Sequence, residues 1–392
     1  MGWIVSGPAT IDKSSKERKV VATIQTRCDE LLKKFWEIEE IPRAVKLTSE
    51  EKRCEELFEE GVRRAEDGKF EVQLPFKQNV EVLGSSGVIA KRRFMALEKK
   101  LNRNADLRIQ YHDFLRKYLE LGHMEVVKDI RSVEGGYYLP HHCVLRPESS
   151  TTKLRVVFDA SCKTSTSYSL NNILYTGPRI QDELVGILLR FRKYKYVFSA
   201  DIEKMYRQIW VANSDRKFQL IYWRFNANEE VRTFALNTVT YGTACAPYLA
   251  VKCLQRIADL KEATHPNESQ AIRSDFYMDD LMTGGDCLGE VVEMRRNLEA
   301  ILLEFGMPLR KWCANNSQIL EGIAKENIEG SLNIEDEELP VKALGVMWCP
   351  RSDVFSLKYK ATEDGKFSKR SILSETAKLF DPLGFVGPVI VV

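Results

Sequence analysis

The sequence predicts a mixed α+β fold, and three observations indicate it. Apolar residues recur at helical spacing after Asn104, which is typical of a helix with one buried face. The apolar run at residues 196–200 leads into Asp201, which is typical of a buried strand that ends on a carboxylate. Farther along, apolar segments flank the adjacent pair Asp279 and Asp280, as in two strands joined by a tight turn.

Helices are predicted in the first third of the chain. Residues 11–66 are dense in charge, and the stretches 28–36 and 51–64 have helical patterns. Asn104 is a suitable N-cap, because its side-chain oxygen can accept a hydrogen bond from a free backbone N–H. The apolar stripe of the helix that follows is formed by Leu107, Tyr111, Phe114, Leu115 and Tyr118. The simplest interpretation of this stripe is core.

Strands and further helices follow from the same patterns. Residues 70–75 alternate between apolar and polar and end in proline, which predicts a short strand. Residues 291–303 look helical, and a glycine and a proline follow them as expected at a helix end. An acidic loop is predicted at residues 322–339, and strand character returns at residues 344–348.

Length and composition exclude several classes of protein. The chain has 392 residues, more than one ordinary domain, and its 44% hydrophobic content can bury a sizeable core. Its 58 basic and 56 acidic side chains nearly balance, so neither a polycation nor a polyanion is indicated. No apolar run approaches the length of a membrane-spanning helix, and the N-terminus lacks the pattern of a secretory signal.

The cysteines and histidines do not indicate a zinc site. The nine cysteines include no Cys-x-x-Cys pair, so reduced thiols are expected. The only neighbouring histidines are His141 and His142. In an extended segment, neighbouring side chains point to opposite faces, so these two are not expected to share a ligand.

Charge is unevenly distributed in the middle of the chain. Residues 141–200 contain nine basic and four acidic side chains, whereas residues 201–290 contain ten basic and 13 acidic ones. A basic segment followed by a carboxylate-bearing segment suits an enzyme that handles phosphates with metal ions. Ordinary solvated surface is the alternative interpretation.

The strongest local signal is the carboxylate pair Asp279 and Asp280. Buried carboxylates are costly unless they are paired or bind a cation, so the pair suggests metal binding. The alternative is a polar turn, since Asp-Asp is a normal turn dipeptide. Asp201 lies 78 residues upstream of Asp279 at the end of another predicted strand. Phosphoryl transfer with two metal ions needs carboxylates from different strands that meet at one point.

Three blocks follow one another along the chain: Asp-Ile-Glu-Lys-Met-Tyr at 201–206, Tyr-Gly-Thr-Ala-Cys-Ala-Pro at 241–247 and Tyr-Met-Asp-Asp at 277–280. In order and spacing they resemble a retroviral-type reverse transcriptase. Further segments are similar to the Bel/Pao family of long-terminal-repeat retrotransposons, namely residues 2–7, 138–144, 154–160, 169–172 and 380–384. The resemblance covers nearly the whole chain and is more specific than any single motif.

The resemblance implies a right-hand polymerase with an N-terminal extension. Fingers and a ferredoxin-like palm are expected at residues 131–320, after a charged, largely helical extension at 11–130. Residues 321–392 are expected to be a partial, truncated thumb and connection. Residues 1–10 resemble the remnant of a protease C-terminal end. Signatures of a complete protease, ribonuclease H or integrase are not recognisable in the sequence.

The resemblance also implies the catalytic residues. Asp201, Asp279 and Asp280 match the metal-binding triad of the palm, in which Asp280 contributes less directly than the other two. The implied cofactors are two Mg²⁺ ions, for which Mn²⁺ is an expected substitute. Lys311 matches a lysine that protonates the pyrophosphate leaving group. A solvated strand lysine is the alternative for Lys311.

The nucleotide-binding residues come from the same match. Arg146 and Arg155 fall where cations of the fingers bind the incoming triphosphate, although an arginine on a strand is more often a surface residue. Tyr206 occupies the position of the sugar-sensing gate, with an ordinary buried tyrosine as the alternative. Tyr241 stands before Gly242, where retroviral enzymes often have glutamine. This departure leaves open how the site supports the sugar.

The sequence therefore predicts an RNA-directed DNA polymerase that extends a DNA primer by two-metal nucleotidyl transfer, as part of a retrotransposon Pol polyprotein. The expected partners are an RNA or DNA template with its primer, deoxynucleoside triphosphates and other parts of the polyprotein, and no membrane. The expected location is the cytoplasm, within retrotransposon particles. The alternative is an inactive or truncated retroelement remnant that at most binds nucleic acid. The three intact aspartates argue against that alternative.

Overall fold

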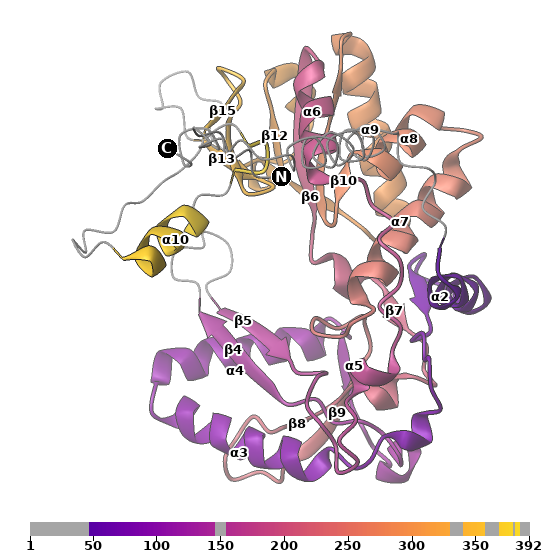
Figure 1. Cartoon of the computed structure of the whole chain (residues 1–392), viewed down its shortest axis with the longest axis vertical. Coiled ribbons are helices and arrows are strands. Elements are labelled where there is room, and N and C mark those ends of the chain that lie inside the picture. Colours follow the sequence, from indigo (N-terminus) through magenta and orange to yellow (C-terminus); the bar gives the residue numbers. More distant parts are fainter. Residues whose placement is uncertain (1–46, 146–153, 330–339, 357–367, 379–380, 385–392) are drawn as a thin grey trace, which may run out of the picture. The chain divides into compact units, whose positions relative to one another are not determined.

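The computed structural model describes residues 47–145, 154–329, 340–356, 368–378 and 381–384. Nearly all of them belong to one unit, Ser49–Val392, to which helices and strands both contribute (Figure 1). The predicted α+β class is confirmed. The helix predicted at residues 28–36 lies outside the described residues, as does Arg146. Within the described part, no helix combines the length and the apolar character needed to cross a bilayer.

Three helices come first: α2 (Ser49–Gly61), α3 (Gly87–Asn102) and α4 (Ala105–Glu120). The predicted cap of α4 is confirmed, because the Asn104 side chain accepts a hydrogen bond from the Leu107 N–H at 3.0 Å. The predicted stripe is buried except for Phe114, which is half-buried. The helix predicted at residues 51–64 ends earlier, at Gly61, because Arg63 and Arg64 pair with a strand instead.

Small sheets and a hairpin make up much of the remaining structure. One sheet joins β1 (Arg63–Arg64), β2 (Phe70–Val72) and β7 (Trp210–Val211), and another joins β3 (Met124–Val126), β9 (Arg232–Leu236) and β8 (Leu220–Trp223). A hairpin joins β4 (His141–Leu145) and β5 (Leu154–Phe158), and the one-turn helix α5 is Leu170–Ile173. Near the C-terminus lie β13 (Val341–Ala343), β14 (Val346–Cys349), β15 (Val354–Ser356) and α10 (Lys369–Lys378). The strand predicted from residue 344 begins at Val346, because Leu344 and Gly345 have positive φ and form the preceding turn.

A four-stranded antiparallel sheet carries the predicted carboxylates. Its strand order is β10 (Phe276–Tyr277), β11 (Asp280–Gly285), β6 (Tyr196–Ile202) and β12 (Leu309–Ala314). Between these strands along the chain lie α7 (Ala246–Lys261), α8 (Pro266–Ser274) and α9 (Leu288–Glu304). The order of elements is that of a split β-α-β-β-α-β unit, which is the ferredoxin-like arrangement.

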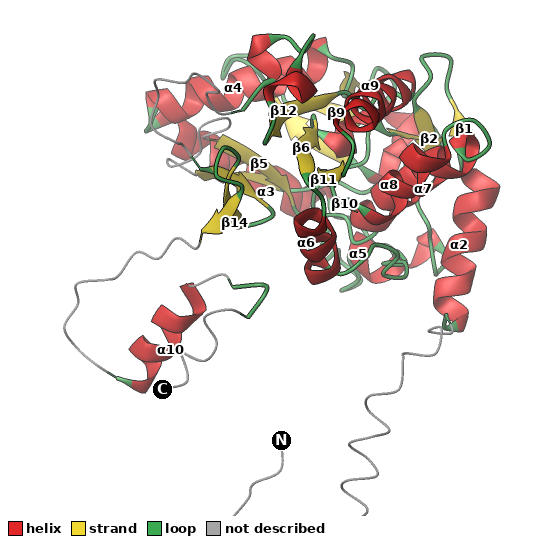
Figure 2. Ribbon diagram, turned by 90° about the horizontal axis from the view of Figure 1, so that it is seen from above, coloured by secondary structure: helices red, strands yellow, loops and turns green. Residues whose placement is uncertain are grey.

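Helices cover both faces of this sheet. On one face, α6 (Leu184–Lys193) buries Ile187 and Phe191 against Val197 of β6. On the other face, α9 joins the main core, which contains Phe198 of β6. Figure 2 shows the sheet between α6 and α9. Successive side chains of a strand alternate between faces, so Asp201 lies on the face of Val197.

His141 is part of the core between α4 and the β4–β5 hairpin. It is buried while His142 is exposed, as predicted for neighbours on an extended strand. His141 Nε2 lies 3.1 Å from the Tyr222 carbonyl oxygen, which can only accept, so Nε2–H donates. Nδ1 then accepts from the Tyr111 hydroxyl at 2.5 Å. Burial lowers the pKa of His141 to about 4.

This buried imidazole predicts acid sensitivity of the fold. A histidine that is neutral when folded and titrates near 6.5 when unfolded binds fewer protons in the folded state, so its contribution is present above pH 6.5 and is lost as pH falls toward about 4. The double variant His141→Phe with Tyr111→Phe should flatten the dependence of the unfolding free energy on pH in this window. Urea denaturation across the window measures it, and an unchanged slope would contradict the assignment.

Candidate active site

Asp201 lies near the C-terminal end of strand β6. Phe198, Ala200 and Ile202 point into the main core, so the alternation of the strand places Asp201 on the opposite face. The Asp201 side chain is 16% exposed. The predicted position of this carboxylate, at the end of an apolar strand, is confirmed.

The β10–β11 hairpin brings the other two carboxylates to Asp201. Tyr277 pairs with Asp280, so Met278 and Asp279 form a two-residue turn, and Met278 has the left-handed φ of 58°. Asp280 lies directly opposite Asp201 in the β11–β6 register. The Asp279 carbonyl accepts a hydrogen bond from the Ile202 N–H at 2.8 Å. The structure therefore brings Asp201, Asp279 and Asp280 close together at one end of the sheet.

The base of this hairpin is held rigidly. Buried Asp275 accepts hydrogen bonds from Thr283 Oγ1 at 2.7 Å and from Arg190 Nε of α6 at 3.1 Å, and its burial raises its pKa. Gly284 of β11 packs directly on β6, since a Cβ there would lie 2.3 Å from the Tyr196 carbonyl oxygen. These contacts fix the position of the hairpin relative to β6, and therefore the position of the two carboxylates in its turn. The sequence patterns did not reveal the Asp275 anchor.

The three carboxylates repel one another. Burial, followed by the charges of Asp279 and Asp201, raises the pKa of Asp280 to about 7. Asp279 is exposed at the tip of the turn. Its carboxylate is nonetheless partly desolvated, and this desolvation together with the charge of Asp201 raises its pKa. A cation beside these groups would relieve the repulsion.

The residues present fit a hard divalent cation. Asp201 Oδ1 is buried and has no hydrogen-bond partner among the described residues, so one ligand oxygen is uncommitted. Carboxylate oxygens are the ligands that Mg²⁺ prefers. Within the described ranges, no group of three or more His, Cys, Asp or Glu side chains has the arrangement of a formed metal site. A lysine ammonium instead faces Asp201.

That lysine is Lys311, on β12. The pairing of β12 with β6 shifts register between Arg310 and Cys313, and Lys311 within this bulge has a φ of 52°. Bulges re-aim side chains, and here Lys311 Nζ donates a hydrogen bond to Asp201 Oδ2. Burial alone would lower the pKa of Lys311, but the hydrogen bond and charge of Asp201 raise it. Lys311 is therefore a cation of the carboxylate site rather than a solvated strand lysine.

The two predicted tyrosines lie against each other. Tyr206 lies in the 3₁₀ turn Met205–Gln208 after β6, and its ring meets the Tyr241 ring edge-to-face at 4.6 Å. Burial, then Tyr241 and Asp279, raises the pKa of Tyr206. The next residue, Arg207, stacks on Tyr118 of α4 at 4.3 Å. Sequence reasoning missed Arg207, which connects this turn to the N-terminal helices.

The turn at Gly242 requires glycine. Its φ is 103°, and a Cβ there would lie 2.0 Å from the Phe158 carbonyl oxygen. Asn171 closes this turn, because its Nδ2 donates to the Gly242 carbonyl at 2.9 Å and its Oδ1 accepts from the Ala244 N–H at 2.8 Å. The sequence signal for Asn171 was its place in the block at residues 169–172. Sequence reasoning assigned it no role.

Of the two predicted arginines, the structure describes Arg155 but not Arg146. Arg155 lies on β5 opposite Val144 and is exposed. Its positive charge offsets a small part of the rise in the pKa of Asp279 that burial and Asp201 cause. The structure therefore brings Arg155 within electrostatic reach of the carboxylates. Arg146 lies outside the described residues.

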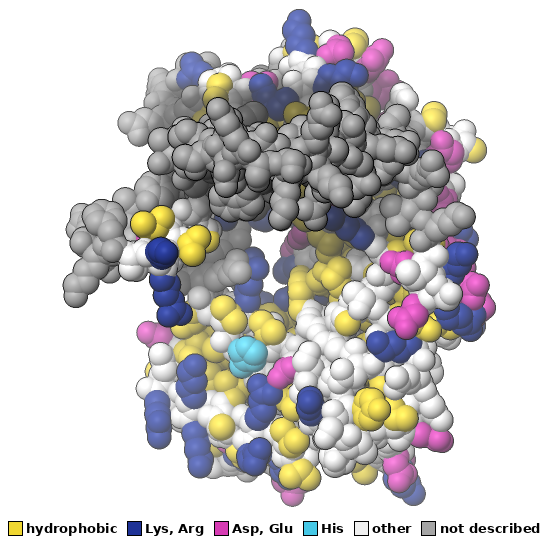
Figure 3. Space-filling model, viewed as in Figure 1, with side chains coloured by type: hydrophobic (Ala, Val, Ile, Leu, Met, Phe, Trp, Pro, Cys, Tyr) yellow, Lys and Arg dark blue, Asp and Glu magenta, His cyan; other side chains and the backbone are white. Residues whose placement is uncertain are grey.

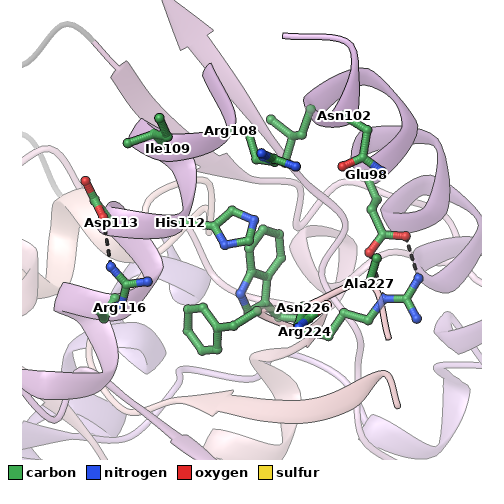
Figure 4. A pocket seen from close by; sticks show the side chains of 13 residues that line it. Glu98, Asn102, Arg108, Ile109, His112, Asp113, Arg116, Arg224, Asn226 and Ala227 are labelled. Atoms are coloured by element: carbon green, nitrogen blue, oxygen red, sulfur yellow. Dashed lines mark hydrogen bonds and ion pairs between the residues drawn. The ribbon is translucent and has the colours of Figure 1, made fainter. Parts of the chain in front are cut away.

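A separate cavity of about 490 Å³ lies between α3, α4 and the end of β8 (Figure 4). Its charges are largely paired: Arg224 donates to both carboxylate oxygens of Glu98 at 2.7 Å, and Arg116 pairs with Asp113 at 3.0 Å. Of the predicted site residues that the structure describes, none lines this cavity. The cavity is therefore not the carboxylate site.

A family model described as reverse transcriptase (RNA-dependent DNA polymerase) matches residues 147–346. This segment is about half of the chain and contains β6, the β10–β11 hairpin and β12. Among curated proteins, none matches the chain.

Proposed function

Because this chain belongs to the reverse transcriptase (RNA-dependent DNA polymerase) family, we propose that its carboxylate site extends a DNA primer by two-metal nucleotidyl transfer. The family establishes the right-hand polymerase fold and the enzyme class, an RNA-directed DNA polymerase that uses a template, a primer and deoxynucleoside triphosphates. The observation that carries the proposal is that Asp201, near the end of β6, lies beside Asp279 and Asp280 at the turn of the β10–β11 hairpin.

Each site residue has a proposed task. Asp201, Asp279 and Asp280 would hold two Mg²⁺ or Mn²⁺ ions, which supply a lowered pKa at the primer 3′-hydroxyl and neutralise the triphosphate. The 3′-hydroxyl would lose its proton to solvent water, its oxygen would attack the α-phosphorus, and the bond from that phosphorus to the leaving pyrophosphate would break. Lys311 holds the proton that the pyrophosphate takes up. Arg155 binds the triphosphate as a bidentate cation.

Basic side chains support contact with the nucleic-acid backbone. In the view of Figure 3, Lys and Arg side chains are spread over the part that contains α3 and α4. Those that are exposed include Lys91, Arg92, Lys99, Lys100 and Arg108. Phosphate contacts supply most of the sequence-independent affinity for nucleic acid, so binding should weaken steeply as salt rises.

The wider context stays a proposal on the sequence blocks alone. We propose that the chain is the polymerase part of a Bel/Pao-type retrotransposon Pol polyprotein and acts in the cytoplasm within retrotransposon particles. The domain division at residues 10, 130 and 320 is part of this proposal. Finding protease, ribonuclease H and integrase sequences adjoining this one in the same reading frame supports it, and their absence there contradicts it.

Extension of a labelled oligo(dT) primer on poly(rA) tests the activity. With Mg²⁺ or Mn²⁺, the chain should add deoxythymidine units and release pyrophosphate, and a chelator should abolish both. Binding of the primer-template without any extension under either metal would support the inactive remnant instead.

A further inference from the structure

Glu329 is held beside Lys311 by the backbone. After β12, the chain returns through the 3₁₀ turn Lys325–Asn327, and Ile328 forms a parallel β-bridge with Trp312. The Glu329 N–H donates to the Trp312 carbonyl at 2.9 Å. Trp312, the neighbour of Lys311 on β12, therefore fixes the position of the Glu329 backbone. Glu329 is half-buried.

A second set of contacts locks the same segment to the strand. Arg310 donates from Nη1 to the Asn327 side-chain oxygen and from Nε to Glu203 Oε2, the latter at 3.0 Å. Glu203 follows β6 directly, so the segment, β12 and β6 are tied together on this side of the carboxylates. The backbone of Glu329 is thus fixed, and within the described part of the chain its carboxylate makes no hydrogen bond or ion pair.

The charges of these groups are coupled. Burial and the charge of Asp201 raise the pKa of Glu329, whereas the ammonium of Lys311 lowers it. Conversely, Glu329 is among the groups that raise the pKa of Lys311, after Asp201. The charges of two carboxylates therefore act on Lys311, and its hydrogen bond is made to Asp201.

This arrangement bears on how the site accepts a metal ion. A divalent cation held by Asp201 competes with the ammonium that now occupies Oδ2 of that carboxylate. An ammonium displaced from Asp201 without a second partner is disfavoured in this half-buried place, which would weaken metal binding. A second carboxylate whose charge already acts on Lys311 would offset part of that penalty.

We propose that Glu329 is a positioning residue that receives the Lys311 ammonium when a divalent cation takes Asp201. The inference rests on the proposed function of the three aspartates as metal ligands. Lys311 stays protonated while the cation binds, and only hydrogen bonds and ion pairs are exchanged in this step. Lys311 thus remains beside the site in the charged form that a proton donor needs.

Calorimetric titration with Mg²⁺ tests the exchange without any turnover. Glu329→Gln should weaken Mg²⁺ binding by about three- to tenfold, because Lys311 then has no second partner and stays on Asp201. Glu329→Asp should recover part of the affinity. The matched control is Glu326→Gln, an exposed glutamate on the same 3₁₀ turn, which should leave the affinity unchanged.

A double-mutant cycle separates positioning from simple attraction of the metal. Lys311→Met should tighten Mg²⁺ binding, and adding Glu329→Gln to it should then change nothing, since the group that Glu329 receives is gone. Equal weakening in both backgrounds would make Glu329 a general charge or a direct ligand and overturn the proposal. Unchanged affinity in the Glu329→Gln single variant would overturn it as well.

The Mg²⁺ titration and the polymerase assay distinguish failure of the Glu329 proposal from failure of the polymerase proposal. If the Mg²⁺ cycle behaves as expected but no primer is extended, the polymerase proposal fails and the role of Glu329 stands. If the primer is extended but the cycle shows no coupling, the role of Glu329 fails alone. A parent chain that binds no Mg²⁺ overturns the metal assignment on which both rest.

Discussion

Asp279→Asn should abolish primer extension, with a fall in rate of about a thousandfold or more. Asp279 lies at the tip of the β10–β11 turn, where its carbonyl accepts a hydrogen bond from the Ile202 N–H and its charge is coupled to those of Asp201 and Asp280. The amide is nearly isosteric, so the backbone of the turn should be unchanged. What is lost is the negative charge that a divalent ion needs.

Two further readings make this prediction specific. Affinity for primer-template should stay within severalfold, since that affinity depends mainly on phosphate contacts elsewhere. The melting temperature in metal-free buffer should not fall, because the substitution removes one of three repelling charges. Asp113→Asn is a matched control, a half-buried aspartate on α4 that pairs with Arg116. Equal extension rates in Asp279→Asn and the parent would contradict the metal assignment.

Tyr206→Ala should retain addition of deoxynucleotides at reduced efficiency and gain addition of ribonucleotides. Tyr206 is five residues after Asp201 and packs edge-to-face on Tyr241 at 4.6 Å. As the proposed sugar gate, this ring would leave no room for a 2′-hydroxyl on the incoming nucleotide. Overpacking of this kind costs about 1–3 kcal/mol, so selectivity should fall by about ten- to hundredfold.

Single-nucleotide addition with both sugars measures this ratio. Tyr206→Phe is the matched control, since it keeps the ring and should keep the selectivity. If Tyr206→Ala leaves the ratio of efficiencies unchanged, discrimination lies elsewhere, and Tyr241 is the next candidate because this residue is 38% exposed.

The sequence predicted those parts of the fold that depend on local pattern. The Asn104 cap, the α4 stripe, strand β6 and the β10–β11 hairpin all follow from residue type and spacing, and all are present. The boundary near residue 61 was wrong, because cross-strand pairing of Arg63 and Arg64 overrode their helical pattern. Long-range pairing of this kind leaves no mark on local periodicity.

The same division holds for the candidate site. Asp201, Asp279 and Asp280 could be predicted because strand ends and a tight turn mark them in the sequence. Asn171, Asp275 and Glu329 could not, since each is placed by a contact with a residue on another element, namely Gly242, Arg190 and Trp312. The aim of Lys311 also escaped prediction, because it depends on a bulge that only the pairing of β12 with β6 reveals.

Templated extension of a DNA primer on an RNA strand tests the central claim most directly. The template should carry a defined, mixed sequence, with Mg²⁺ present and one deoxynucleotide supplied at a time. The account predicts that the parent adds only the nucleotide complementary to the next template base, and that Asp201→Asn adds none. A parent that binds this primer-template but adds no nucleotide, or adds nucleotides regardless of the template, would contradict it.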